Sequence, residues 1–170
     1  MAKVLTFSRV FPAYHPKAGE PTYFVEKIWE SMWEDSGIGD PLFDELKIEY
    51  LNFRRHTYPA KYHTIRAGKR WIAGDTFSPR VWSGKPYNSK QIIIATDIKV
   101  KHIWDFDIKD GYILLNGRKI CNSRFLAVRY KTPVQIAAND GLTIEELLDW
   151  FQYPKDFSGQ IICWSDDVHY

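Results

Sequence analysis

The chain has 170 residues, of which 45% are hydrophobic and 16% aromatic, and its formal net charge is +2. This length and apolar content predict a single domain, residues 1–170, with a hydrophobic core. No stretch approaches the roughly 18 uncharged apolar residues that a membrane helix needs, and the first residues lack the features of a signal peptide. We therefore expect a cytoplasmic protein that does not enter a membrane.

Several classes of site have no motif in this sequence. The two cysteines, Cys121 and Cys163, do not form a CxxC pair, so we expect two unpaired thiols rather than a disulfide. Structural zinc needs about four ligands, usually in close pairs, and none are found, so no metal is expected. The glycine-rich dinucleotide and P-loop motifs and the zinc deaminase signature are also absent, and we expect no cofactor.

Positive charge is concentrated in one segment, residues 54–90. It holds nine basic residues and one acidic residue, Asp75, so its net charge is +8 and the rest of the chain carries −6. The basic residues are Arg54, Arg55, Lys61, Arg66, Lys69, Arg70, Arg80, Lys85 and Lys90. The aromatic residues among them are Tyr58, Tyr62, Trp71, Trp82 and Tyr87. Cations interleaved with flat rings suit the phosphates and bases of single-stranded nucleic acid, although a solvated basic face is the simpler alternative.

The first third of the chain reads as one strand followed by helices. Residues 3–7 have the composition of a short strand. Pro21 suits a first helical position and an apolar residue recurs at every fourth position after Phe24, which predicts a helix over residues 21–35. Asp40 before Pro41 predicts a second helix start. Residues 42–50 fit either a helix or a strand.

The middle of the chain predicts a β-meander. Residues 91–94 form a short apolar run, and apolar residues then alternate with charged ones over residues 98–108, which predicts one half-buried strand with a bulge near Ile103. Two tight hairpin turns follow, at Asp110-Gly111 and Asn116-Gly117. A small barrel closes such a meander without exposed edges.

The last third of the chain has a clear helix start. Thr143 and Glu146 form a capping box, which predicts a helix from Ile144 to about Phe151. Residues 160–164 are expected to form a closing strand. The fold class predicted from all of these elements is α+β, a small β-barrel flanked by helices.

One stretch resembles a known family. Residues 61–66 read Lys-x-x-Thr-Ile-Arg, and Gly74-Asp75 follow at the entry of the next strand. With Thr6-Phe7, Arg9 and Phe11 near the start, this pattern resembles the ASCH family, a branch of the PUA-like β-barrels. The resemblance covers residues 3–11 and 58–164 and leaves residues 12–57 as a helical insertion. It implies a PUA-like barrel with a cleft for RNA or a modified nucleoside.

The resemblance also implies a catalytic alternative. Some bacterial members are 4-acetylcytidine amidohydrolases that use a Lys, a Thr and a Glu, which correspond to Lys61, Thr64 and Asp140. Asp140 departs from the family pattern because its side chain is one methylene shorter. Residues 61 and 64 point to opposite faces of a regular strand, so a shared cleft requires Lys61 to come from the turn after Pro59. Other members bind or cleave RNA, which keeps a ribonuclease as a further alternative.

We therefore predict a binding domain for RNA or a modified nucleoside. The residues expected to hold phosphates or to stack on bases are Arg9, Arg66, Lys69, Arg70, Trp71, Arg80, Trp82 and Lys85. The residues expected in the core are Trp29, Trp33, Trp104, Trp150 and a hydrogen-bonded His102. A protein-interaction domain that uses the insertion is the simplest alternative. The RNA, the modification, the oligomeric state and the pathway do not follow from the sequence.

Overall fold

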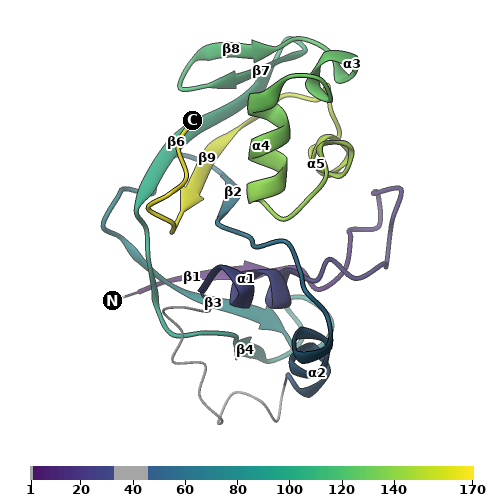
Figure 1. Ribbon diagram of the computed structural model, residues 1–170, viewed down its shortest axis with the longest axis vertical. Helices are drawn as coiled ribbons and strands as arrows, with labels where there is room; N and C mark the ends of the chain where they lie inside the picture. Colours follow the sequence, from purple (N-terminus) through teal and green to yellow (C-terminus); the bar gives the residue numbers. More distant parts are fainter. Residues whose placement is uncertain (1, 33–45) are drawn as a thin grey trace. The chain divides into compact units, whose positions relative to one another are not determined.

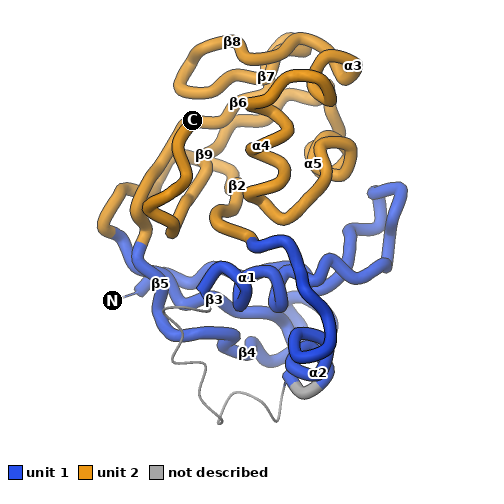
Figure 2. The backbone as a smooth tube through the Cα atoms, viewed as in Figure 1, with its two compact units in different colours: residues 1–60, 75–99 blue, residues 61–74, 100–170 orange. Residues whose placement is uncertain are grey.

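The computed structural model describes residues 2–32 and 46–170 (Figure 1). The chain divides into two compact units (Figure 2). Unit 1 comprises Met1–Ala60 and Asp75–Lys99, and unit 2 comprises Lys61–Gly74 and Val100–Tyr170. Each unit contains one sheet and helices, so the α+β class predicted from the sequence is confirmed.

Unit 1 is built on a small mixed sheet. β1 (Lys3–Phe7) runs parallel to β3 (Thr76–Trp82), and β3 pairs antiparallel with β4 (Gln91–Ile93) and β5 (Ile98–Lys99). Two helices of this unit, α1 (Phe24–Met32) and α2 (Lys47–Arg55), pack against each other. Trp29 of α1 is fully buried, and its indole Nε1 donates a hydrogen bond to the carbonyl oxygen of Ile94 at 2.7 Å. The core position predicted for Trp29 is thereby confirmed.

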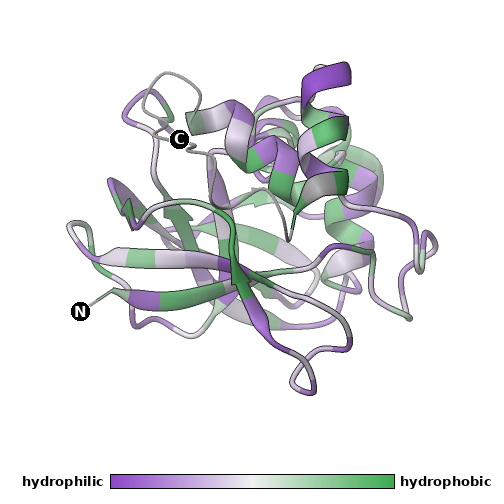
Figure 3. Ribbon diagram, turned by 90° about the horizontal axis from the view of Figure 1, so that it is seen from below, coloured by the Kyte–Doolittle hydropathy of each residue, from purple (hydrophilic) through white to green (hydrophobic). Residues whose placement is uncertain are grey.

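Unit 2 is built on a five-stranded antiparallel sheet. Its order is β2 (His63–Ala67), β9 (Phe157–Cys163), β6 (His102–Lys109), β7 (Tyr112–Leu115) and β8 (Arg118–Cys121). Its helices are α3 (Arg124–Ala127), α4 (Lys131–Asn139) and α5 (Ile144–Trp150). The capping box at Thr143 and Glu146 is present, so the predicted start of α5 is confirmed. The strand ribbons of the molecule carry both hydrophobic and hydrophilic residues (Figure 3).

Both predicted hairpin turns are formed. Asp110-Gly111 joins β6 to β7, and Asn116-Gly117 joins β7 to β8. The backbone φ angles are 52° and 75° in the first turn and 48° and 74° in the second. Positive φ at both central residues matches the twist of the flanking strands and is the reason why Asn, Asp and Gly occupy these turns.

The predicted strand over residues 98–108 is interrupted, and the bulge expected near Ile103 is wrong. The chain leaves the strand conformation at Val100 and Lys101, so β5 pairs in the sheet of unit 1 and β6 pairs in the sheet of unit 2. Alternating apolar residues continue through the break because both segments have one buried face. The strand pairing of the described residues gives two separate sheets, neither of which closes into the predicted barrel.

The helices of the first third differ from expectation at their ends. α1 begins at Phe24 rather than Pro21, because Pro21 forms an isolated β-bridge with Val10. Residues 47–55 are helical, which resolves the ambiguity at that end of the 42–50 segment. The predicted end of the first helix, the start at Asp40-Pro41 and Trp33 lie outside the described residues.

The two thiols are unpaired, as predicted, and both are buried. Burial raises the pKa of the Cys163 thiol to about 11. Over the described ranges, no helix has the length and apolar character that crossing a membrane requires.

Candidate functional site

Lys61 and Asp140, both predicted as catalytic, form a buried ion pair in unit 2. Lys61 Nζ donates hydrogen bonds to Asp140 Oδ1 at 2.7 Å and to the Asp140 carbonyl oxygen at 2.5 Å. The Lys61 residue is fully buried and Asp140 is 6% exposed. Lys61 lies before β2 rather than within it, which is the position that a cleft shared with Thr64 would require. Asp140 is the C-terminal cap of α4. The amide of Tyr62 donates to the carbonyl oxygen of Asn139 at 2.8 Å, which fixes the two segments beside each other.

His63 extends this pair into a larger polar cluster. His63 is fully buried; its Nδ1 lies 3.5 Å from Asp140 Oδ1, and its Nε2 lies 2.7 Å from the hydroxyl of Tyr170. Asn139 Nδ2 donates to the same hydroxyl at 2.9 Å. The Tyr170 hydroxyl oxygen accepts from Asn139, and the hydroxyl shares a second hydrogen bond with His63 Nε2. The other ring nitrogen of His63, Nδ1, faces the Asp140 carboxylate. We call Lys61, His63, Asn139, Asp140 and Tyr170 the buried cluster.

The environment sets the charge of each member of the buried cluster. Burial lowers the pKa of His63, and it outweighs the opposing effect of Asp140. Burial also acts to raise the pKa of Asp140, but the Lys61 charge and the hydrogen bonds from His63 and Lys61 hold it below its ordinary value. Burial raises the pKa of Tyr170. At neutral pH the cluster thus contains an ionised Asp140, a neutral His63 and a protonated Tyr170.

Thr64, the third residue of the predicted catalytic set, is not joined to this pair. In β2, His63 is paired with Cys163 and Thr64 with Ile162, so their side chains point to opposite faces of the sheet. His63 contacts Asp140 on its own face. Within the described parts of the chain, no hydrogen bond connects the Thr64 hydroxyl to either charged group. The structure brings two of the three predicted residues together.

The remaining predicted residues of unit 2 are constrained by their surroundings. Lys69 Nζ lies 2.9 Å from Asp105 Oδ2 and 3.5 Å from Asp107 Oδ2, so two carboxylates offset its charge. Trp71 is only 2% exposed, and its amide donates to Gln160 Oε1 at 3.0 Å. The ring of Trp71 is therefore covered, contrary to the stacking role predicted from the sequence. Arg66 is half-buried and Arg70 is exposed.

The predicted residues of unit 1 other than Arg9 lie on one hairpin. β3, β4 and the connecting loop, residues 76–93, carry Arg80, Lys85 and Lys90 and no acidic residue. Trp82 is half-buried and Tyr87 is 88% exposed, and their ring centroids lie 5.4 Å apart. We call residues 76–93 the basic hairpin. Arg9 lies outside it and forms an ion pair with Glu49.

Arg80 is held in place on the basic hairpin by two side-chain hydrogen bonds. Its Nε donates to Ser78 Oγ at 3.3 Å and its Nη1 donates to Gln91 Oε1 at 3.4 Å. Both of these partners are neutral, so neither hydrogen bond offsets the positive charge of the Arg80 guanidinium. Lys85 and Lys90 are exposed on the loop.

Several residues of these sites could not be selected from the sequence. His63 lies inside the motif of residues 61–66 but showed no ligand spacing. Asn139 lies on α4, which was not predicted, and Tyr170 follows β9 without a motif around it. His102 was expected to be a hydrogen-bonded core residue. It is half-buried instead, its Nε2 has no hydrogen-bond partner among the described residues, and its ring lies 5.6 Å from that of His169.

No group of three or more metal-ligating side chains suits a metal ion in the portion of the chain that the structure describes.

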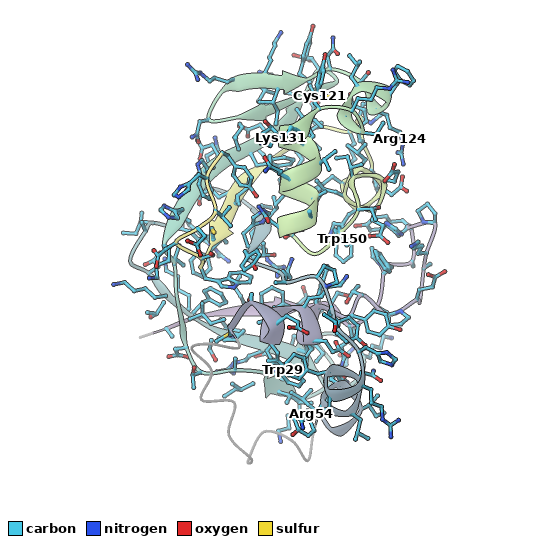
Figure 4. The ribbon with its side chains drawn as sticks, in the orientation of Figure 1. Trp29, Arg54, Cys121, Arg124, Lys131 and Trp150 are labelled. Carbon is cyan, nitrogen blue, oxygen red and sulfur yellow. The ribbon has the colours of Figure 1, made fainter. Side chains whose placement is uncertain are left out.

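Comparison of the chain with protein-family models, with curated proteins and with solved structures gave no match. The resemblance to the ASCH family accordingly depends on the motif residues and their placement. The basic segment, which begins at Arg54 near the end of α2 (Figure 4), is divided between the two units. Each unit must be considered separately as a binding surface.

Proposed function

We propose that the protein is an ASCH-like, PUA-like domain that binds single-stranded RNA or a modified nucleoside through the basic hairpin. The observation that supports this proposal is the exposed Tyr87 ring, which packs against Trp82 on a hairpin with three basic residues and no carboxylate. Base stacking on an aromatic ring contributes about 1–3 kcal/mol per base, and it is tolerant of sequence. Lysine and arginine on the same element attract the phosphates.

The backbone of Tyr87 also supports a binding role. Its φ angle is 63°, in the left-handed region that residues with a bulky side chain rarely adopt. Such a conformation is unfavourable unless its surroundings maintain it, and it is common at sites that present a side chain to a ligand. Here it places an aromatic ring in solvent beside Trp82.

The direct test is a titration of fluorescently labelled single-stranded RNA, followed by anisotropy. Tyr87→Ala is expected to weaken binding by about 5-fold to 100-fold, which corresponds to the loss of one stacked base. Tyr14→Ala is the matched control, because Tyr14 is 54% exposed in the same unit but lies outside the basic hairpin. Equal affinities of Tyr87→Ala and the unmodified protein would contradict the proposal.

A second candidate function is hydrolysis of an amide on a 4-acetylcytidine-like nucleoside, and the Lys61–Asp140 pair favours it. Buried titratable groups with shifted pKa values are common in catalytic sites. A general base needs a lone pair, whereas Lys61 donates to two oxygens of Asp140. Lys61 can serve as a base only after its ammonium group has given up a proton to water and the substrate has displaced one of these contacts. Both steps require the site to open, since Lys61 is fully buried.

This second candidate is tested by incubation with 4-acetylcytidine, followed by chromatography. The expected result for an amidohydrolase is cytidine, with no product from Lys61→Met. Thr64→Val separates two mechanisms, because Thr64 points to the opposite sheet face from His63. Full turnover in Thr64→Val means that Thr64 is not the nucleophile. The ribonuclease alternative has no separate observation in its favour among the described residues.

A further inference from the structure

A cavity of about 120 Å³ lies within unit 1, apart from the basic hairpin. Its polar lining comes from Arg9, Glu26, Glu49 and Asn52, and two aromatic residues, Tyr23 and Phe24, lie beside them. These residues belong to the segment after β1, the first turn of α1 and one side of α2. An engineered cavity of roughly 150 Å³ accepts one benzene ring, so the size of this smaller cavity limits a ligand to a single six-membered ring.

Arg9 supplies a hydrogen-bond donor without an acceptor. One end of its guanidinium, Nη2, donates to Glu49 Oε1. Its Nε is buried and has no hydrogen-bond partner among the described residues. A buried N–H group without a partner costs free energy, and a ligand oxygen or ring nitrogen in the cavity would satisfy it.

Glu26 supplies the complementary acceptor. It is 3% exposed, and its Oε1 accepts a hydrogen bond from Asn52 Nδ2 at 3.4 Å, which is long. Burial raises the pKa of this carboxyl, so its charge is poorly solvated. A ligand N–H donor would stabilise that charge. The lining of the cavity therefore includes a donor, an acceptor and aromatic surface.

We infer that this cavity binds a single six-membered heterocycle whose edge carries an N–H donor next to a carbonyl or ring-nitrogen acceptor, the class that includes uracil and cytosine. Arg9 Nε–H donates to the acceptor of the ring and the Glu26 carboxylate accepts its N–H group. Glu49 is a positioning residue, because it holds the guanidinium. The inference does not depend on the RNA binding proposed for the basic hairpin.

The test is a two-dimensional NMR titration of the full chain with free uracil and free cytosine, with benzene as the ring that lacks a polar edge. We expect saturable shifts of the Tyr23, Phe24 and Asn52 signals for one pyrimidine, with a dissociation constant in the millimolar range or tighter for so small a ligand. Arg9→Lys keeps the charge beside Glu49 and lacks the Nε–H donor. It should weaken binding about tenfold, which corresponds to the loss of one charge-assisted hydrogen bond.

Glu26→Gln is the second variant. It replaces the carboxylate by a neutral side chain of the same size, and it tests the inference even if Arg9→Lys does not fold. It should weaken the binding of the same pyrimidine about tenfold. Tyr87→Ala should leave it unchanged, which separates this inference from the proposed RNA binding. The inference is overturned if neither pyrimidine gives saturable shifts up to its solubility limit. It is equally overturned if benzene binds as tightly as the pyrimidines, or if both cavity variants bind like the unmodified protein.

Discussion

At the scale of single residues, the Lys61–Asp140 pair should be a major determinant of stability. Removal of one partner leaves a buried charge without compensation, which destabilises a protein by about 3–5 kcal/mol. We expect Lys61→Met to lower the free energy of unfolding by an amount of this order, as measured by urea denaturation. The double variant Lys61→Met/Asp140→Leu should recover most of the loss, because both charges are gone.

The control for this prediction is Lys3→Met. Lys3 pairs with Asp75 at 2.5 Å, and its side chain is 42% exposed. Exposed ion pairs contribute about 0–1 kcal/mol, since water and salt screen them. If Lys61→Met were no more destabilising than Lys3→Met, Lys61 would not depend on Asp140 in the way that the structure indicates.

His63 and Asp140 give the folded state a defined pH dependence. Folding lowers the pKa of His63, so below about pH 6.5 the unfolded chain binds a proton that the folded chain does not. The contribution of His63 to the stability is therefore fully present above that pH and decreases as the pH falls below it. Folding also lowers the pKa of Asp140, so its contribution is present above about pH 4 and is lost on further acidification.

The test compares urea denaturation at pH 7 and pH 5.5. The unmodified protein should lose up to about 1.4 kcal/mol per pH unit through His63, and His63→Gln should show a correspondingly smaller decrease. An identical pH dependence of the two proteins would mean that His63 is not held in its neutral form.

At the scale of elements, β9 depends on a glycine for its place between two strands. Gly159 faces Ala67 of β2 and Phe106 of β6. A Cβ atom there would clash with the main-chain oxygen of Arg66 and lie 2.8 Å from the ring of Phe157. Backbone must shift to accommodate it, so Gly159→Ala should destabilise the protein by about 1–3 kcal/mol or more.

Gly84 provides the matched control for that substitution. A Cβ atom at Gly84 would meet Ser89 Cβ at 3.6 Å, an ordinary contact. Thermal unfolding should show a lower midpoint for Gly159→Ala and almost none of this change for Gly84→Ala. Equal midpoints would show that β2 and β9 are not packed as closely as the structure indicates.

The helix α5 allows a second prediction at this scale. The Thr143 hydroxyl accepts from the amide of Glu146 at 3.2 Å, and the Glu146 carboxylate accepts from the amide of Thr143 at 2.8 Å. Thr143→Ala should cost about 1 kcal/mol because one of these bonds is lost, whereas Thr143→Ser should cost much less. Urea denaturation of the two variants distinguishes a lost cap from lost packing. Equal destabilisation by Thr143→Ala and Thr143→Ser would mean that the hydroxyl does not stabilise the helix.

At the scale of the whole molecule, local chemistry made some elements predictable. The turns at Asp110-Gly111 and Asn116-Gly117 and the capping box of α5 depend on a few adjacent residues, so the sequence was sufficient for them. The break between β5 and β6 depends on which sheet each segment joins, and no local pattern at Val100 and Lys101 reveals it. α4 was not predicted, although its buried residues Pro133, Ile136 and Ala137 have helical spacing.

The candidate sites show the same limit. The family resemblance brought Lys61 and Asp140 to attention, and the structure places them 2.7 Å apart. His63 and Tyr170 joined them only through tertiary contacts that are distant along the chain. A count of charges over residues 54–90 could not show that Lys69 is offset by Asp105 and Asp107, which lie on another strand.

The central claim is that the basic hairpin binds single-stranded RNA, and the most direct measurement is the affinity as a function of salt concentration. Three basic residues of the hairpin in contact with phosphates predict a slope of about −2 for the logarithm of the association constant against the logarithm of the salt concentration. Lys85→Ala/Lys90→Ala should reduce the slope to about −0.7. An unchanged slope in the double variant, or no binding at low salt, would contradict the claim.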